Sequence, residues 1–150
     1  MTINGTDFLD PGLAVLLAST ADSTRPRRRV FPGHPAQVAH ARRFVRRALA
    51  GHRAAEDAAL LTSELATNAV CHTATGQGDT FEIVIFRHPA IVRIAVIDAG
   101  ATTVPTLPTP GSLNASGRGL SLVEALARRW GHHGNQHGRT VWFELERPTT

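Results

Sequence analysis

The sequence predicts a two-layer α+β sandwich, in which three helices cover one face of a mixed, mainly antiparallel sheet of four or five strands. Two β-branched, apolar segments, Thr80–Arg87 and Ile91–Asp98, are joined by only three residues, which predicts an antiparallel hairpin. Three other segments carry apolar residues at helical spacing. Hairpin-linked strands with helices gathered on one face are typical of two-layer folds.

The first half of the chain predicts one short strand and two helices. Residues 28–31 are expected to form the strand, which ends at Pro32-Gly33, and Pro35 is well suited to the first turn of a helix that runs to about residue 50. A second helix is expected over 54–72, with acidic residues in its first turn, where the helix dipole favours them.

The second half contains the hairpin, a long loop, a helix and a last strand. Residues 99–116 are rich in Pro, Gly, Ser and Thr and predict a functional loop or lid. A helix is expected over 119–129, a turn-rich His/Gly segment over 131–138, and a strand over 140–146, where apolar and polar residues alternate.

Length and composition favour a single globular domain. The chain has 150 residues, of which 42% are hydrophobic and 19% charged, so it can bury about 70% of its extended-chain surface. We assign residues 28–150 to this domain and residues 1–27 to a flexible N-terminal extension, because 1–27 show no period that predicts a packed element.

Charge and cysteine usage exclude several classes of protein. All 16 basic residues are arginine, which excludes phosphate-loop NTPases, eukaryotic-type protein kinases and Schiff-base enzymes, all of which need a lysine. The single Cys71 cannot form an internal disulfide, no segment is long enough to cross a membrane, and no basic leader is evident, so we expect a cytoplasmic protein. The net charge of +4 indicates acidic partners only weakly.

Three polar residues of the second helix share one face. Glu64, Asn68 and His72 are spaced by four, so they form a stripe on a helix that is otherwise rich in Ala and Leu. A buried carboxylate and amide would need a ligand, metal or water as partner, whereas an exposed helix face is the simpler interpretation of such a triplet alone.

Two glycine-containing turns are candidate ligand contacts. Asp98 ends an apolar strand and precedes Ala99-Gly100, which allows a sharp turn and a close approach to a ligand. Gly117-Arg118-Gly119-Leu120 opens a helix whose free N–H groups can bind an anion, with Arg118 adding charge. Taken alone, the first is an ordinary turn and the second a flexible cap.

The order of these motifs is more specific than any one of them. Glu64–Ala69, Ile97-Asp98-Ala99-Gly100, Gly117–Leu120 and the strand that starts Gly138-Arg139-Thr140 together resemble the GHKL ATPase superfamily. Within it, the chain resembles the bacterial anti-sigma-factor serine/threonine kinases. The resemblance covers residues 28–147 and implies the Bergerat fold with its ATP site.

The resemblance implies a role for each polar residue of the stripe. Asn68 would coordinate the Mg²⁺ that bridges the ATP phosphates, and Glu64 would orient or deprotonate the attacking hydroxyl. Mg²⁺ prefers hard oxygen ligands and commonly takes one or two from protein, which suits this assignment. His72 would contact the same phosphates, with a helix-end cap as the equal alternative.

The glycine motifs receive nucleotide contacts from the same resemblance. Asp98 would accept a hydrogen bond from the adenine amine, Gly100 would leave room for the base, and Thr140 would join through its hydroxyl or a water. Because guanine has a carbonyl where adenine has the amine, an ionised acceptor favours adenine. The phosphates would bind at four consecutive residues, Gly117, Arg118, Gly119 and Leu120.

The chain departs from the family pattern at two positions. Thr102 stands where a second glycine is common, and Ala115 stands where some kinases of the group carry a basic residue. The second difference bears on phosphoryl transfer more than on nucleotide binding.

The partners implied by the resemblance are a sigma factor and an anti-anti-sigma protein that would be phosphorylated. A homodimer is consistent with the family, and we expect no direct binding of nucleic acid or membrane. Two alternatives remain: a nucleotide-dependent binding module without kinase activity, and the catalytic domain of a histidine kinase, which is disfavoured because no dimerisation helix with a phospho-accepting histidine precedes the domain.

Two further clusters are expected to be solvated. His132, His133 and His137 lack a nearby Cys or carboxylate to complete a tetrahedral metal site. The arginines of the 35–50 helix are expected to form a solvated face, and an acidic protein would be their partner if they are functional.

Overall fold

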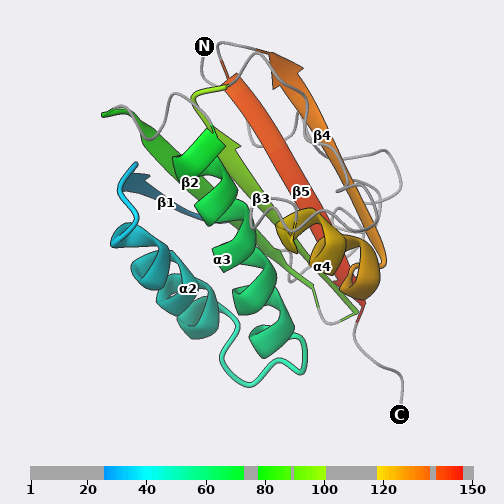
Figure 1. Ribbon diagram of the computed structural model, residues 1–150. Coiled ribbons are helices and arrows are strands. Elements are labelled where there is room, and N and C mark those ends of the chain that lie inside the picture. The colour runs from blue at the N-terminus through cyan, green and yellow to red at the C-terminus, as the bar shows by residue number, and fades with distance from the viewer. Residues whose placement is uncertain (1–25, 73–77, 89, 101–117, 136–137, 147–150) are drawn as a thin grey trace.

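The computed structural model describes residues 26–72, 78–88, 90–100, 118–135 and 138–146, and the side chains of residues 72, 118–121 and 135 lie outside this description. The predicted fold class is confirmed: helices lie on one face of a five-stranded sheet whose strands all pair antiparallel (Figure 1). The strand order is β1-β2-β3-β5-β4. The strands are β1 (Arg27–Pro32), β2 (Thr80–Arg87), β3 (Ile91–Asp98), β4 (Arg129–Asn135) and β5 (Gly138–Glu146).

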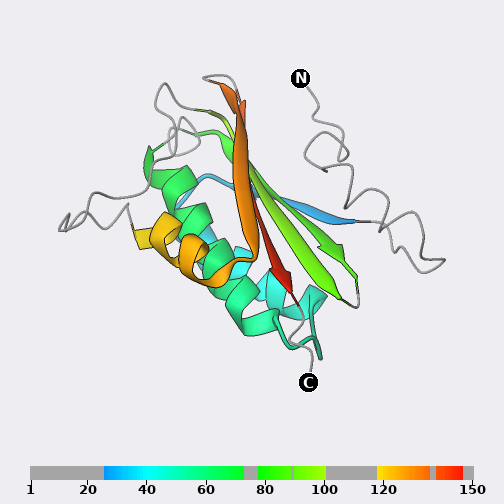
Figure 2. The same cartoon turned by 90° about the vertical axis from the view of Figure 1, so that its right-hand side faces the viewer.

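The described part of the chain contains three helices, which form the second layer of the sandwich. They are α2 (Gln37–Ala48), α3 (Ala55–His72) and α4 (Arg118–Leu126). Figure 2 shows them together on one side of the sheet. The middle helix, α3, packs against α2, α4 and β3, so it lies at the centre of the layer.

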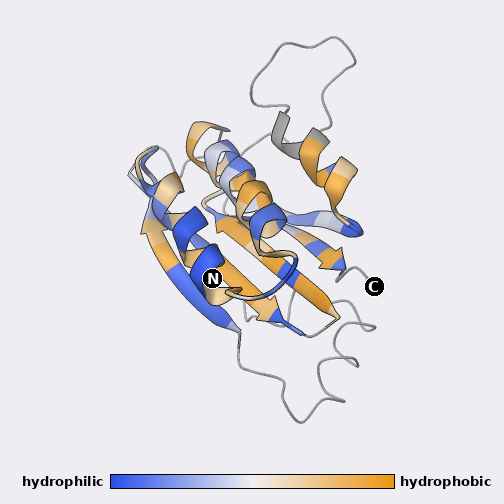
Figure 3. Cartoon of the chain, turned by 90° about the horizontal axis from the view of Figure 1, so that it is seen from below, coloured by the Kyte–Doolittle hydropathy of each residue, from blue (hydrophilic) through white to orange (hydrophobic). Residues whose placement is uncertain are grey.

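The core lies between the two layers, as the sequence periodicity predicts. On α2, the buried residues Ala41, Val45 and Ala48 recur at helical spacing and face the sheet. The strands contribute every second residue to this core, for example Ile94 and Val96 of β3. Figure 3 shows the same segregation, with apolar colour on the strands beneath the helices.

The expectation of a turn-rich segment over 131–138 is wrong, because β4 spans Arg129–Asn135 and pairs with β5. Glycine and asparagine are poor strand formers, and the pairing overrides their local preference. Gly131 is needed here, because a Cβ at this position would lie 2.8 Å from the indole of Trp142. The preceding helix correspondingly ends at Leu126 and not at residue 129.

The sheet face opposite the helices carries a buried charged cluster. The Glu144 carboxylate, 1% exposed, accepts hydrogen bonds from Arg93 Nε at 3.0 Å and from Arg129 Nε at 3.0 Å. The Arg93 side chain is fully buried, and its guanidinium lies 3.9 Å from the centre of the Trp142 ring. Arg93 is therefore held by both an ion pair and a cation–π contact.

Candidate functional site

The end of β3 carries the most strongly constrained carboxylate of the candidate site. Asp98 is the last residue of β3 and is 6% exposed. Its Oδ1 accepts a hydrogen bond from the backbone N–H of Gly100 at 2.8 Å. Gly100 has a φ of 87°, so the expected sharp turn after Asp98 is confirmed, and this backbone conformation favours glycine. The turn fixes one carboxylate oxygen in place.

The other carboxylate oxygen of Asp98 is held by Arg139, which the sequence analysis did not assign to the site. Arg139 is directly opposite Asp98 in the β3–β5 ladder. It donates from Nε and from a terminal nitrogen to Asp98 Oδ2, at 3.2 and 3.1 Å. The alternation of side chains along the strand could have indicated it. Arg139 lies two residues before the core residue Val141 and four before Phe143, so all three side chains lie on the same face of β5.

Burial and charge act on Asp98 in opposite directions. Burial raises the pKa of Asp98 above its usual range, while the Arg139 charge and the Gly100 N–H lower the pKa by a smaller amount. We conclude that the carboxylate is kept in an apolar environment by two specific donors.

The hydrogen-bonding capacity of Asp98 leaves room for one further donor. A carboxylate has about four lone-pair positions. Three are filled by the two bonds from Arg139 to Oδ2 and the single bond from Gly100 to Oδ1. Among the described residues, one acceptor position therefore remains on Oδ1.

Helix α3 carries two of the predicted residues, Glu64 and Asn68. Glu64 and Asn68 lie one helical turn apart and are both half-buried, between the buried residues Leu65 and Ala69 and the exposed Thr67. Figure 1 shows that the C-terminal ends of α3 and β3 lie at the same end of the domain. An amide oxygen and a carboxylate on one helix face are suitable ligands for Mg²⁺.

The remaining phosphate candidates are only partly described. Arg118 is the first residue of α4, so Gly119 and Leu120 belong to its first turn, as expected for a helix N-terminus that can bind an anion. The His72 side chain, Gly117 and residues 101–116 of the expected lid lie outside the described residues.

The structure does not bring Thr140 to the same face as Asp98. Thr140 is paired with Ile97, and the alternation of side chains along β5 directs it to the face that carries Trp142 and Glu144. The Thr140 side chain is fully buried, and its hydroxyl has no hydrogen-bond partner in the described part of the chain. Arg139, and not Thr140, is the β5 residue in contact with Asp98.

The histidines of β4 are separated by the same alternation. His132 and His133 are consecutive in the strand, so their side chains leave opposite faces of the sheet, and His137 lies outside the described residues. Within the described ranges, no group of three or more His, Cys, Asp or Glu side chains could hold a metal ion. Also within these ranges, no helix is long and apolar enough to span a bilayer.

The fold agrees with a comparison to known families. The sequence model of the histidine kinase-like ATPase domain matches residues 31–145, which is most of the chain. The chain therefore belongs to the histidine kinase-like ATPase domain family, within the GHKL superfamily. No curated protein matches the chain.

Membership of this family makes the chain an ATP-binding domain, and the site residues fit that ligand. The free acceptor position on Asp98 suits the adenine amine, which is a donor. The amide of Asn68 suits Mg²⁺, which retains water and needs few protein ligands. The sequence has no lysine, so among its side chains arginine is the cation suited to phosphate, and helix N–H groups can add to it.

Proposed function

We propose that this ATP-binding domain is an anti-sigma-factor serine/threonine kinase, which phosphorylates an anti-anti-sigma protein and sequesters a sigma factor. The observation that carries the nucleotide part of the proposal is the buried Asp98 carboxylate, which two donors orient and which has one acceptor position left among the described residues. The kinase part is supported by Glu64, a half-buried carboxylate one helical turn from Asn68.

In this proposal each site residue has a separate task. Asp98 selects adenine, because its ionised oxygen accepts from the amine and would repel the carbonyl of guanine. Asn68 holds Mg²⁺, which supplies charge neutralisation at the phosphates when bound. Arg118 and the first turn of α4 contact the phosphates, since a helix N-terminus and a guanidinium both favour negative charge.

Glu64 is the proposed general base. As the serine or threonine hydroxyl of the partner attacks the terminal phosphorus, a new O–P bond forms and the bond from that phosphorus to the ADP oxygen breaks. The hydroxyl proton passes to the Glu64 carboxylate, and ADP leaves with the bonding electrons. Phosphoryl transfer depends mostly on positioning and charge, so a single well-placed carboxylate is sufficient.

The proposal is tested by measuring phosphate transfer from labelled ATP to an anti-anti-sigma protein. Glu64→Gln is expected to bind ATP normally and to lower the transfer rate by about 100-fold or more, as expected for loss of a general base. Asp57→Asn is the matched control, because Asp57 is an exposed carboxylate in the first turn of the same helix. Its transfer rate should be unchanged.

One outcome would contradict the role of Glu64, and two would contradict the kinase assignment. Undiminished transfer by Glu64→Gln would exclude Glu64 as the base. Nucleotide-dependent association with the partner and no incorporated phosphate would identify a binding module. An acid-labile phosphate on a partner histidine would identify histidine-kinase chemistry.

A further inference from the structure

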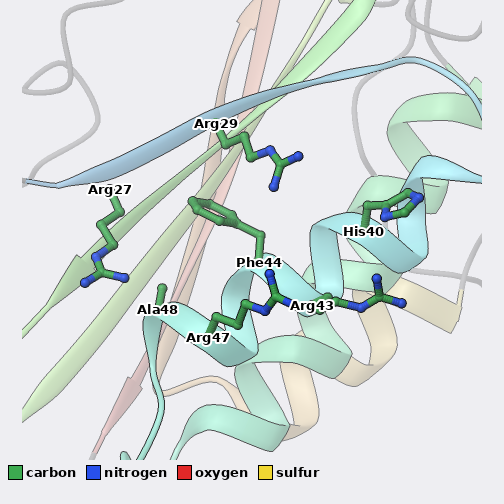
Figure 4. Close-up of a pocket in the computed structure, with 7 residues that line it drawn as sticks. All are labelled: Arg27, Arg29, His40, Arg43, Phe44, Arg47 and Ala48. Carbon is green, nitrogen blue, oxygen red and sulfur yellow. The ribbon is translucent and has the colours of Figure 1, made fainter.

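A basic groove lies at the opposite edge of the sheet from β4, between the edge strand β1 and helix α2. It is a cavity of 360 Å³ that is lined by Arg27, Arg29, His40, Arg43, Phe44, Arg47 and Ala48. Figure 4 shows the β1 arginines on one side, the α2 arginines on the other, and the Phe44 ring directed toward β1. No carboxylate is among the lining residues.

The arginines of this groove differ from their neighbours in lacking an acidic partner. Arg28, on the other face of β1, pairs with Glu82 at 2.8 Å, and Arg46 of α2 pairs with Glu56 at 3.1 Å. Among the described residues, no ion pair is made by any of the four groove arginines, which are Arg27, Arg29, Arg43 and Arg47. Four like charges around one cavity repel one another, and an anionic ligand would relieve this repulsion.

The spacing of the arginines matches an extended chain. Arg27 and Arg29 are two residues apart on a strand, a distance of about 7 Å along the strand axis. Arg43 and Arg47 are four residues apart on a helix, a distance of about 6 Å along the helix axis. Alternate side chains of an extended peptide repeat at about 7 Å, so carboxylates at every second position match both rows.

The edge strand adds a second feature that suits a peptide. β1 ends the strand order, so in the described part of the chain nothing pairs with its outer edge, whose backbone N–H and C=O groups can accept another strand. Val30 is 54% exposed on the face of β1 opposite the groove, where the intervening side chains of such a peptide would lie. A second copy of β1 is disfavoured as the added strand, because its three arginines would lie against the three arginines of this β1.

We propose that this groove binds an extended segment of an acidic partner protein, which carries carboxylates at alternate positions and adds to the sheet beside β1. Single-stranded nucleic acid is the less suitable ligand, because it needs exposed aromatic rings for stacking. Phe44 is half-buried and packs edge-on against Phe31, with ring centres 6.0 Å apart. The proposal does not rest on the kinase activity, because β2 separates β1 from the strand that carries Asp98.

The test measures binding of a fluorescent peptide to the full chain by anisotropy. The probe is a peptide of roughly ten residues, the length of a long strand, with glutamate at every second position and Thr or Val between. A peptide of the same composition with its glutamates contiguous is the sequence control, and oligothymidine is the nucleic-acid control. The alternating peptide is expected to bind most tightly and to weaken at high ionic strength.

The chain offers a matched pair of variants on α2. Arg43→Gln with Arg47→Gln removes two groove charges and should weaken peptide binding by about tenfold or more, as expected for the loss of charge-assisted hydrogen bonds. Arg42→Gln with Arg46→Gln removes the same charge at the same spacing outside the groove, and it should change the affinity by less than about threefold, as expected for surface charges away from the ligand. Both double variants should retain the unfolding midpoint and the ATP affinity of the parent chain.

Several results would overturn the proposal. Equal losses in the two double variants would show that only net charge matters. Equal binding of the contiguous peptide would exclude recognition of an extended alternating segment. Tighter binding of oligothymidine, lost in the groove variant, would make the groove a nucleic-acid surface, and absence of peptide binding would exclude the proposal outright. If the parent chain did not bind ATP, the proposed kinase function would be contradicted, and the result for the groove would stand.

Discussion

Asp98 and Arg139 face each other across the β3–β5 ladder and form a buried ion pair, with Arg139 nitrogens 3.1 and 3.2 Å from Asp98 Oδ2. Both residues are less than a tenth exposed. The pair holds the carboxylate in one orientation, while the Gly100 N–H holds the second oxygen. In the proposed site, Arg139 is therefore a positioning residue for the group that selects the base.

Removing Arg139 should destabilise the fold strongly at neutral pH. Arg139→Met leaves Asp98 as a buried charge without its ionic partner, which should lower the free energy of unfolding by about 3 kcal/mol. The double variant Asp98→Asn with Arg139→Met no longer contains that charge and should recover part of the loss. Urea unfolding of the parent, both single variants and the double variant gives the coupling energy. Strict additivity of the two single effects would contradict the ion pair.

The loss of stability caused by Arg139→Met should also depend on pH. Burial already raises the pKa of Asp98, and removal of Arg139 takes away a charge that lowers it, so the pKa in the variant is higher still. A carboxyl whose pKa is raised on folding stabilises the native state most at pH below its unfolded value, and this contribution is lost as pH rises through its folded pKa. The stability difference between parent and variant should therefore shrink on acidification through the pKa of Asp98 in the variant. A stability difference between parent and variant that grew on acidification would contradict this prediction.

The part of this architecture that the sequence predicts is the part governed by local periodicity. The helical spacing of Ala41, Val45 and Ala48 and the β2–β3 hairpin both appear as expected. Periodicity cannot show which residue of a strand meets which residue of its neighbour, and a shift of one residue reverses every side chain. The neighbour of Asp98 is an instance, because only the pairing with β3 places Arg139 opposite Asp98 and Thr140 opposite Ile97.

Two other features depend on contacts between distant parts of the sequence. The strand β4 is stabilised by β5 and by the fit of Gly131 under Trp142, whereas its own composition indicates turns. Arg93 and Glu144 are 51 residues apart, and nothing local to either residue indicates that both are buried. Such features follow from tertiary packing and not from residue preferences.

Nucleotide selectivity should follow from Asp98. The chain is expected to bind ATP at least about tenfold more tightly than GTP, because the guanine carbonyl would face a carboxylate that can only accept. Asp98→Asn should lose most of this preference, since an amide can turn its donor to the carbonyl. Calorimetric titrations of both proteins with both nucleotides measure the ratio, and equal affinities in the parent chain would contradict the role of Asp98.

The affinity for ATP should depend on Mg²⁺ through Asn68. Asn68→Ala removes the proposed amide ligand, so its ATP affinity should resemble that of the parent chain measured with EDTA, and added Mg²⁺ should change it little. Thr67→Ala is the matched control, because Thr67 is the adjacent exposed residue of α3 and its hydroxyl donates to the Ser63 carbonyl. This control should keep the full Mg²⁺ effect. A parent chain that binds ATP equally with Mg²⁺ and with EDTA would remove the basis for assigning Asn68.

The charged cluster on the other sheet face should be essential for stability. Glu144→Gln removes the carboxylate that pairs with the fully buried Arg93, and we expect the free energy of unfolding to fall by about 3–5 kcal/mol. Glu146→Gln is the matched control two residues along the same strand, where an exposed carboxylate pairs with Arg128 at 3.4 Å. Its effect should stay within about 0.5 kcal/mol, because exposed ion pairs contribute little. Chemical unfolding of the two variants compares them directly, and equal effects would show that burial of the Arg93–Glu144 pair does not control its contribution.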